Sequence, residues 1–482
     1  MMERKPNAWM SAVPMLALIG MLFCVLMNFG SDALDGASQV VLLVATGICI
    51  TLCVFVYKME WKRFEKAIVK TMSDMAVSIF ILLLIGAMSG TWMISGVVPT
   101  LIYYGIQIIS PQIFLLAACA ISGLVAVLTG SSWTTVATIG IALMGIGKAE
   151  GFSDGWIAGA IISGAYFGDK VSPLSDTTVL ASTVSGTPIF QHIRYMMYTT
   201  VPSIVLALLI FGVAGFVLVQ DSAADVHVYL DALNQSFNIS LLTMIVPVLT
   251  GILIYKKAPA LVVLFCSAVM AALMAIFMQG GLLCEIGGAA NGQGIFKGVM
   301  TVVFGSTSVD TGNDLLNKLV STSGMGGMLN TIWLIICALA FGSVMHESGM
   351  LRCFFAALFK RLTRTRFGLV FSTVINGLSL NMATGDQYIS IIMTANMFKD
   401  EYKNQGYESR LLSRTSEDSA TVTSVLIPWN TCGMTQSTVL GVPTFTYLPF
   451  CFFNLISPLM SLVHALFGWW IVRREATDPQ KL

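Results

Sequence analysis

Apolar stretches of about 20 residues recur along the whole chain, separated by short polar and glycine-rich breaks. A helix of about 20 apolar residues crosses about 30 Å of hydrocarbon, at about 1.5 Å per residue. Some stretches are too short to cross alone and flank Gly-, Ser- and Asp-rich breaks, which predicts interrupted helices and re-entrant hairpins. The pattern predicts helical segments at 10–29, 37–57, 73–95, 97–109, 112–130, 132–147, 155–168, 195–219, 239–255, 259–279, 329–347, 350–359, 367–381, 387–398, 411–427 and 446–471.

The composition agrees with a membrane protein. Among 482 residues, 56% are hydrophobic and 11% are charged, whereas soluble domains carry about 25% charged residues. Twenty-six basic and 25 acidic residues leave a net charge of +1, which excludes nucleic acid as a main partner. The ten cysteines are scattered without zinc-ligand spacing, so we interpret them as small apolar fillers. We therefore predict an all-α polytopic membrane protein.

Local sequence features recur in the two halves of the chain. The pairs are Ser95-Gly96 with Ser348-Gly349, Thr129-Gly130 with Thr384-Gly385, and Ser175-Asp176-Thr177 with Glu417-Asp418-Ser419. Their offsets are 253, 255 and 242 residues, and a shorter loop in the second half would explain the last value. Three matched features in the same order predict two structural repeats.

Charge predicts that the two repeats have opposite orientations. Basic residues follow the second predicted span in the first half but lie at 360–366 in the second, so the basic loops have exchanged ends. By the positive-inside rule both termini and the 360–366 loop are cytoplasmic, and the acidic loops at 31–36 and 221–235 are external. The predicted units are an N-terminal helix (1–36), repeat 1 (37–220), an external loop (221–238), repeat 2 (239–471) and a cytoplasmic tail (472–482).

Four polar clusters interrupt the apolar helices: 129–135, 168–178, 381–387 and 416–431. Pro173 and Pro428 open the helix in two of them and free carbonyl oxygens next to carboxylates and hydroxyls. Oxygen-rich clusters suit a hard cation such as sodium, and a carboxylate there can also take a proton. Because charges in the membrane interior are costly, these clusters are candidates for an ion pathway.

We expect Asp176 and Asp418 to be the main sodium ligands that exchange protons. Three other acidic residues are candidates that also have a structural interpretation. Asp169 could pair with Lys170, Glu417 with Arg414, and Asp386 could cap a helix. The predicted neutral ligands are Ser175, Thr177, Thr178, Ser419, Thr421 and Asn430, and the predicted hairpin-tip ligands are Ser131, Ser132 and Thr384 beside Asp386.

Two enzyme signatures are incomplete. His346-Glu347 lacks the second histidine of a zinc-binding HExxH helix, and Gly147-Lys148 lacks the first glycine and the Ser or Thr of a phosphate loop. We therefore predict a protein that is not an enzyme, has no cofactor, and uses an ion gradient for transport.

The polar clusters resemble those of the NhaC family of sodium/proton antiporters. The resemblance lies in residues 168–178, 416–421 and 427–433, and the similarity in length and span layout extends over nearly the whole chain. It implies a multi-pass secondary transporter of the bacterial cytoplasmic membrane, with two inverted repeats and opposed hairpins. The family also has a branch that resembles malate/lactate exchangers, so the resemblance does not fix the substrate.

The sequence favours sodium/proton exchange by alternating access around a site between the repeats. Five acidic groups outnumber the single Lys170 in the four clusters, which favours a cation over an organic anion. Two alternatives stay open: sodium- and proton-coupled exchange of small organic acids, and a channel or membrane sensor without coupled transport. The expected partners are sodium, protons and membrane lipid, with a small organic acid and a homo-oligomer as further options.

Overall fold

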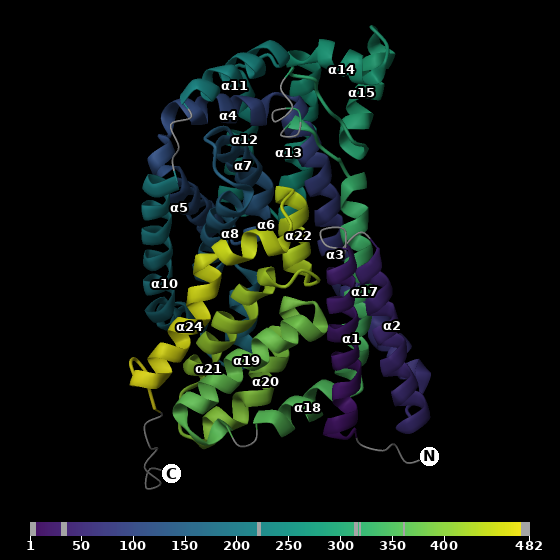
Figure 1. The fold of residues 1–482 in the computed structure, drawn as a ribbon, viewed down its shortest axis with the longest axis vertical. Helices are drawn as coiled ribbons and strands as arrows, with labels where there is room; N and C mark the ends of the chain where they lie inside the picture. The colour runs from purple at the N-terminus through teal and green to yellow at the C-terminus, as the bar shows by residue number, and fades with distance from the viewer. Residues whose placement is uncertain are drawn as a thin grey trace.

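The computed structural model describes residues 6–29, 36–218, 223–312, 317, 320–359 and 362–473, which form helices joined by turns (Figure 1). Most of the predicted 31–36 loop and of the 472–482 tail, as well as Lys360 and Arg361, lie outside these ranges. The helices of the first half are α1 (Ala8–Phe29), α2 (Ala37–Thr51), α3 (Trp61–Ile94), α4 (Val97–Ile108), α5 (Pro111–Thr129), α6 (Ser132–Thr135), α7 (Ile141–Ala149), α8 (Asp154–Val171), α9 (Asp176–Ser185), α10 (Ile189–Leu218) and α11 (Ala223–Ser236). Those of the second half are α12 (Ile245–Tyr255), α13 (Ala260–Met278), α14 (Gly280–Gly287), α15 (Gly292–Phe304), α17 (Leu329–Glu347), α18 (Met350–Phe359), α19 (Arg366–Thr384), α20 (Gln387–Asn404), α21 (Ser409–Ser416), α22 (Thr431–Leu440), α23 (Thr444–Tyr447) and α24 (Phe452–Phe467).

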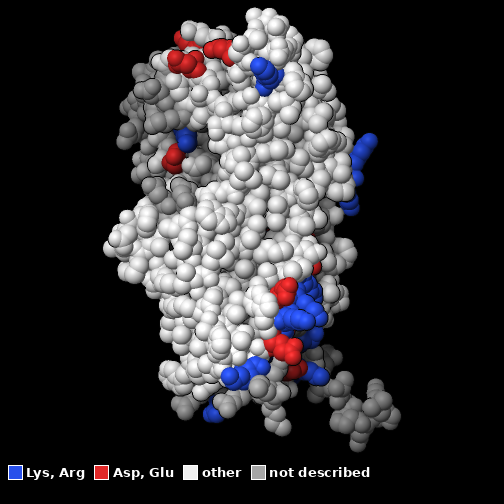
Figure 2. All heavy atoms as spheres, turned by 90° about the vertical axis from the view of Figure 1, so that its right-hand side faces the viewer, with Lys and Arg blue, Asp and Glu red and all other residues white. Residues whose placement is uncertain are grey.

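Many of these helices are long and apolar enough to cross a membrane. Within the described residues there are eight such helices, or up to ten if two sharply bent helix pairs are each counted as one span. Figure 2 shows a face that is mostly uncharged, with acidic side chains near the top and a mixed group of basic and acidic side chains in the lower part. These features confirm the predicted all-α polytopic membrane protein.

The pattern of apolar segments did not predict several of the helices. Helices α9 and α22 were not predicted, because serine and threonine make up much of each and hide them from a search for apolar segments. The predicted external loop at 221–238 includes helix α11, and α14 and α15 lie in a region where no helix was predicted. Helix α3 begins at Trp61, twelve residues before the predicted span that starts at 73.

A constant spacing of 255 residues relates five helices of the first half to five of the second. Helices α5, α6, α8, α9 and α10 begin 255 residues before α19, α20, α21, α22 and α23 (for α5 and α19, 366 − 111 = 255). The spacing agrees with the predicted match of Thr129 and Thr384. At this spacing Asp176 corresponds to Thr431, since both are the first residue of their helix, whereas the predicted match paired Asp176 with Asp418.

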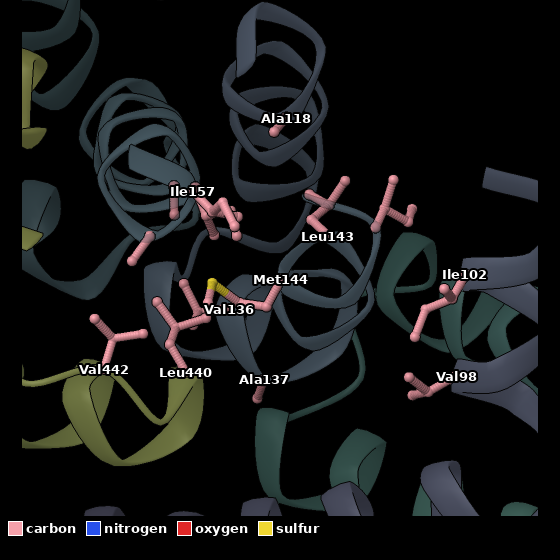
Figure 3. Close-up of a cluster of buried hydrophobic side chains, with 14 of the residues drawn as sticks. Val98, Ile102, Ala118, Val136, Ala137, Leu143, Met144, Ile157, Leu440 and Val442 are labelled. Atoms are coloured by element: carbon pink, nitrogen blue, oxygen red, sulfur yellow. The ribbon is translucent and has the colours of Figure 1, made fainter. Parts of the chain in front are cut away.

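The helices around α8 are packed closely (Figure 3). Apolar side chains from α4, α5, α7 and α8 meet residues at the end of α22, among them Ile102, Ala118, Met144, Ile157 and Leu440, in a buried cluster. A Cβ atom on Gly164 would lie 2.0 Å from the Cys119 carbonyl oxygen, and one on Gly168 would lie 2.3 Å from that of Gly123. Glycine therefore permits the close approach of α5 and α8.

The two halves interlock. Helix α9 packs against α20 and α21 of the second half, and α22 packs against α6 and α7 of the first. Helix α2 packs against α17, and α13 packs against α3. The polar starts of α9 and α22 are thus held where elements of both halves meet.

Candidate functional site

A cavity of about 770 Å³ opens between the two halves. Its wall combines residues of α3, the α5–α6 turn, the α8–α9 connection, the α12–α13 turn and the start of α20. The polar residues of the lining include four carboxylates and one lysine; they are Thr71, Asp74, Ser78, Thr129, Ser131, Thr134, Asp169, Asp176, Lys257, Asp386, Gln387 and Tyr388. The acidic excess in the lining gives the cavity a preference for cations.

The α5–α6 turn is held by a compact set of hydrogen bonds. Gly130 ends α5 in the left-handed conformation (φ 66°), which favours glycine. The Thr129 hydroxyl donates to the Ser131 carbonyl oxygen (3.1 Å) and accepts from the Ser131 N–H (3.2 Å). Ser131 then caps α6 by accepting from the Thr134 N–H (3.2 Å).

The α19–α20 turn has the same arrangement. Gly385 ends α19 with the same φ of 66°. The Thr384 hydroxyl donates to the Asp386 carbonyl oxygen (3.1 Å) and accepts from the Asp386 N–H (3.3 Å). Asp386 caps α20 by accepting from the Ile389 N–H (2.8 Å), so it has the predicted capping role in the place of Ser131. The two turns differ at this position by one negative charge.

Asp169 and Asp386 each present a free carboxylate oxygen. Asp169 Oδ2 accepts from the N–H (3.0 Å) and the hydroxyl (2.7 Å) of Ser132. Asp169 Oδ1 and Asp386 Oδ2 are buried and have no hydrogen-bond partner within the described part of the chain. Because a buried carboxylate oxygen without a partner is costly, both atoms are suited to bind a cation or a proton.

Asp176 lies at the start of α9, where the two halves meet. Its Oδ2 accepts a hydrogen bond from the Tyr388 hydroxyl of α20 (2.6 Å). Ser175 caps α9, and its hydroxyl lies 3.0 Å from that of Thr177. The Thr178 hydroxyl donates to the Lys170 carbonyl oxygen (3.0 Å). Of these residues Asp176 lines the cavity, while the three hydroxyls hold the α8–α9 connection together.

Asp418 lies in a different place from the one predicted. It forms a fully buried ion pair with Lys170 and accepts hydrogen bonds from Ser457 and Ser461 of α24. The Lys170 ammonium also donates to the Ser457 hydroxyl (2.9 Å). Asp418 is not in the lining of the cavity, and Lys170 pairs with it rather than with Asp169, the suggested partner.

Glu417 is fully buried beside this ion pair, in a π-helical turn, η7 (Glu417–Thr421). Its suggested partner Arg414 forms no ion pair with it in the described structure, and lies instead against the Tyr195 ring at 4.6 Å. Ser419 donates to the Thr415 carbonyl oxygen (2.7 Å), and the Thr421 hydroxyl is buried without a partner among the described residues. Asn430 caps α22 by accepting from the Cys432 N–H (3.0 Å). None of these residues lines the cavity.

Five polar residues of the cavity lie outside the predicted polar clusters: Thr71, Asp74, Ser78, Lys257 and Tyr388. Tyr388 directly follows the third cluster (381–387), so a window one residue longer would have included it. Asp74 and Lys257 lie outside the clusters, in α3 and in the α12–α13 turn, and only the packing of α13 against α3 brings them to the cavity.

The fold and this cavity define a multi-pass membrane protein with an acidic site between its halves. The chain belongs to the Na+/H+ antiporter family, whose model matches residues 164–469. It is 34% identical to the Na(+)/H(+) antiporter NhaC of Alkalihalophilus pseudofirmus, over 96% of each chain. It is also 34% identical to the malate-2H(+)/Na(+)-lactate antiporter of Bacillus subtilis, over 97% of each chain, and 31% identical to the arginine/ornithine antiporter ArcD of Halobacterium salinarum, over 99% of this chain and 95% of that one.

Proposed function

We propose that this protein exchanges sodium for protons across the cytoplasmic membrane by alternating access, with the cavity as the ion-binding site. The free oxygens of Asp169 and Asp386 are the observation on which the proposal depends. Asp176 and the hydroxyl of Ser131 add further oxygen atoms to the same wall. Carboxylate and hydroxyl oxygens are the ligands of hard cations, and together they can replace the water shell of sodium.

Sodium ions and protons compete for the same carboxylates of the cavity. A protonated carboxyl group is a poor sodium ligand, and a bound sodium ion opposes protonation. We therefore expect sodium binding to strengthen as the pH rises. Lys170 does not compete for this site, because its ammonium is engaged by Asp418.

Two inverted repeats would allow the cavity to open to the two sides of the membrane in turn. The 255-residue spacing and the shared turn geometry support a repeat, and in Figure 1 α4 and α7 lie in the upper half of the molecule while α18, α19 and α20 lie in the lower half. We place the repeated core at 61–218 and 329–467, which is narrower than the predicted repeats at 37–220 and 239–471. Rocking of the core elements against their surroundings would open the cavity to each side in turn.

The orientation of the chain is part of the proposal. Basic residues place both termini and the 360–366 loop in the cytoplasm and the 221–235 segment outside. Single cysteines at Asp231 and Arg364 of a cysteine-free variant test it with a membrane-impermeant maleimide on intact cells. We expect labelling at 231 and none at 364, and the reverse pattern would overturn the orientation.

A flux assay tests the exchange itself. Proteoliposomes that contain only this protein receive a pH gradient, acidic inside, and ²²Na⁺ outside. We expect sodium uptake that ends when the gradient is collapsed, with no organic acid present. A channel would conduct sodium without any counterflow of protons, so flux that is independent of the pH gradient would contradict exchange.

Exchange of small organic acids is the second candidate. A volume of about 770 Å³ is far larger than one sodium ion needs and is within the range of small-molecule sites. Lys257 in the cavity wall could pair with a carboxylate. Sodium movement that begins only after malate, lactate or an amino acid is added would favour this candidate.

A further inference from the structure

We propose that Glu417 is a proton-exchange site separate from the sodium site in the cavity. This inference rests on the proposed function and adds a second proton site to the cavity carboxylates at which the two ions compete. Glu417 is fully buried in η7, does not line the cavity, and has no hydrogen-bond partner for either carboxylate oxygen within the described residues. A π-helical turn inside a helix is often found at a functional position.

Burial without partners means that Glu417 is protonated in this conformation. An ionised carboxylate in such a place costs several kcal/mol unless a cation or several donors compensate it. Lys170 is engaged by Asp418, which also accepts from Ser457 and Ser461, and Arg414 lies against the Tyr195 ring and forms no ion pair with Glu417 in the described structure. A neutral carboxyl group is therefore the form that the surroundings accept.

The charged and titratable groups around η7 define how the proton can leave. They are Asp169 and Lys170 of α8, Arg414 of α21, His192 of α10, His464 of α24 and Asp418 of η7 itself. Helices α9, α19 and α20 also pack against η7, and from α19 the Asn381 amide donates to the Ala420 carbonyl oxygen (2.6 Å). Arg414, whose buried guanidinium nitrogens have no hydrogen-bond partner among the described residues, is the counter-charge available to Glu417 once it loses its proton.

Asp169 links Glu417 to the cavity. It precedes Lys170 in α8 and Glu417 precedes Asp418 in η7, so the Lys170–Asp418 ion pair joins the two segments, and Asp169 is among the charges that act on Glu417. A negative charge on Asp169 opposes ionisation of Glu417 through an interior of low dielectric constant. Sodium bound at Asp169 cancels that charge, so sodium binding favours release of the Glu417 proton. By thermodynamic linkage, protonation of Glu417 weakens sodium binding to the same extent.

Proton release upon sodium binding tests this role. Calorimetric titration of the purified full-length protein with NaCl, in two buffers with different ionisation enthalpies, gives the number of protons released per sodium ion bound. Glu417→Gln keeps the shape of the neutral side chain but has no proton to exchange. We expect loss of the proton release assigned to Glu417 and a weaker pH dependence of sodium affinity, with sodium binding itself retained and the remaining dependence due to the cavity carboxylates. The matched control is Glu65→Gln on the exposed start of α3, with wild-type release.

The outcomes separate the inference from the proposed function. Proton release and pH dependence that are unchanged in Glu417→Gln would overturn the inference alone. A wild-type protein that binds no sodium would overturn the proposed function and the inference with it. If Glu417→Gln does not fold, Glu417→Asp replaces it: we expect a shifted pH midpoint of sodium binding, and an unchanged midpoint would overturn the inference.

Discussion

The two hairpin turns have nearly the same backbone and different charges. In both, a threonine closes the turn, a glycine with φ of 66° ends the first helix, and the next residue caps the second. The cap is neutral Ser131 in one turn and Asp386 in the other. At the starts of α9 and α22 the difference is reversed: α9 of the first half begins with the charged Asp176, and α22 of the second half begins with the neutral Thr431. The two turns thus share a shape, whereas the charges at the corresponding positions differ between the halves.

A second contrast separates the carboxylates by their surroundings. Asp169 and Asp386 line a cavity and each keep a free oxygen, whereas Asp418 is closed off by Lys170 and two serine hydroxyls. The first arrangement leaves room for an ion, and the second is already neutralised. The following substitutions test this contrast.

Lys170→Met is expected to have the largest effect of these substitutions, and the effect is on the stability of the folded protein. It leaves Asp418 buried without its counter-ion, and removing one partner of a buried pair costs about 3–5 kcal/mol. We expect loss of monodisperse protein in detergent and a strongly lowered unfolding temperature. The double variant Lys170→Met/Asp418→Leu removes both charges and should recover most of the folded protein. A single variant as stable as the wild type would contradict the buried pair.

Asp169→Asn should abolish sodium transport without loss of folded protein. The asparagine side-chain oxygen can still accept from the N–H and hydroxyl of Ser132, but the negative charge is gone. We expect at least about a hundredfold loss of ²²Na⁺ uptake, because a lost charged ligand costs about 3 kcal/mol or more. Asp154→Asn, at the exposed start of the same helix, is the control and should transport normally. Wild-type uptake by Asp169→Asn would exclude this residue from the site.

Asp386→Ser turns the second hairpin tip into a copy of the first. Serine caps a helix about as well as aspartate, so we expect a stability change below about 1 kcal/mol. Sodium affinity should fall by about tenfold or more, because the site loses a charged ligand worth at least about 1.4 kcal/mol. The reverse result, with affinity kept and stability lost, would mean that Asp386 only caps α20.

Tyr388→Phe is expected to have the smallest effect of these substitutions, and the effect is on sodium affinity. It removes the hydrogen bond to Asp176 and keeps the ring. The loss of one hydrogen bond to a charged group at an accessible position should change sodium affinity by about two- to tenfold. Affinity loss beyond a hundredfold would make Tyr388 a direct ligand rather than a residue that positions Asp176.

The sequence was a good guide to the helices and turns, and a poorer one to the charge pairs. Thr129 and Thr384 could be matched in advance because the same short motif forms the same turn in both halves. Asp169 and Lys170 are neighbours in sequence, yet consecutive residues of a helix point in different directions. Lys170 therefore reaches Asp418 on η7, 248 residues away, and Asp169 faces the cavity. Only the packing of α8 against elements of the second half decides these partners.

Direct binding of ²²Na⁺ to purified protein tests the central claim, that the sodium site lies in the cavity at Asp169 and Asp386 and not at Asp418. The wild type, Asp169→Asn, Asp386→Asn and the double variant Lys170→Met/Asp418→Leu are compared at one pH by scintillation proximity. We predict saturable binding by the wild type and the double variant and strongly reduced binding by both cavity variants. Binding that is retained in Asp169→Asn and Asp386→Asn but lost in the double variant would contradict the account.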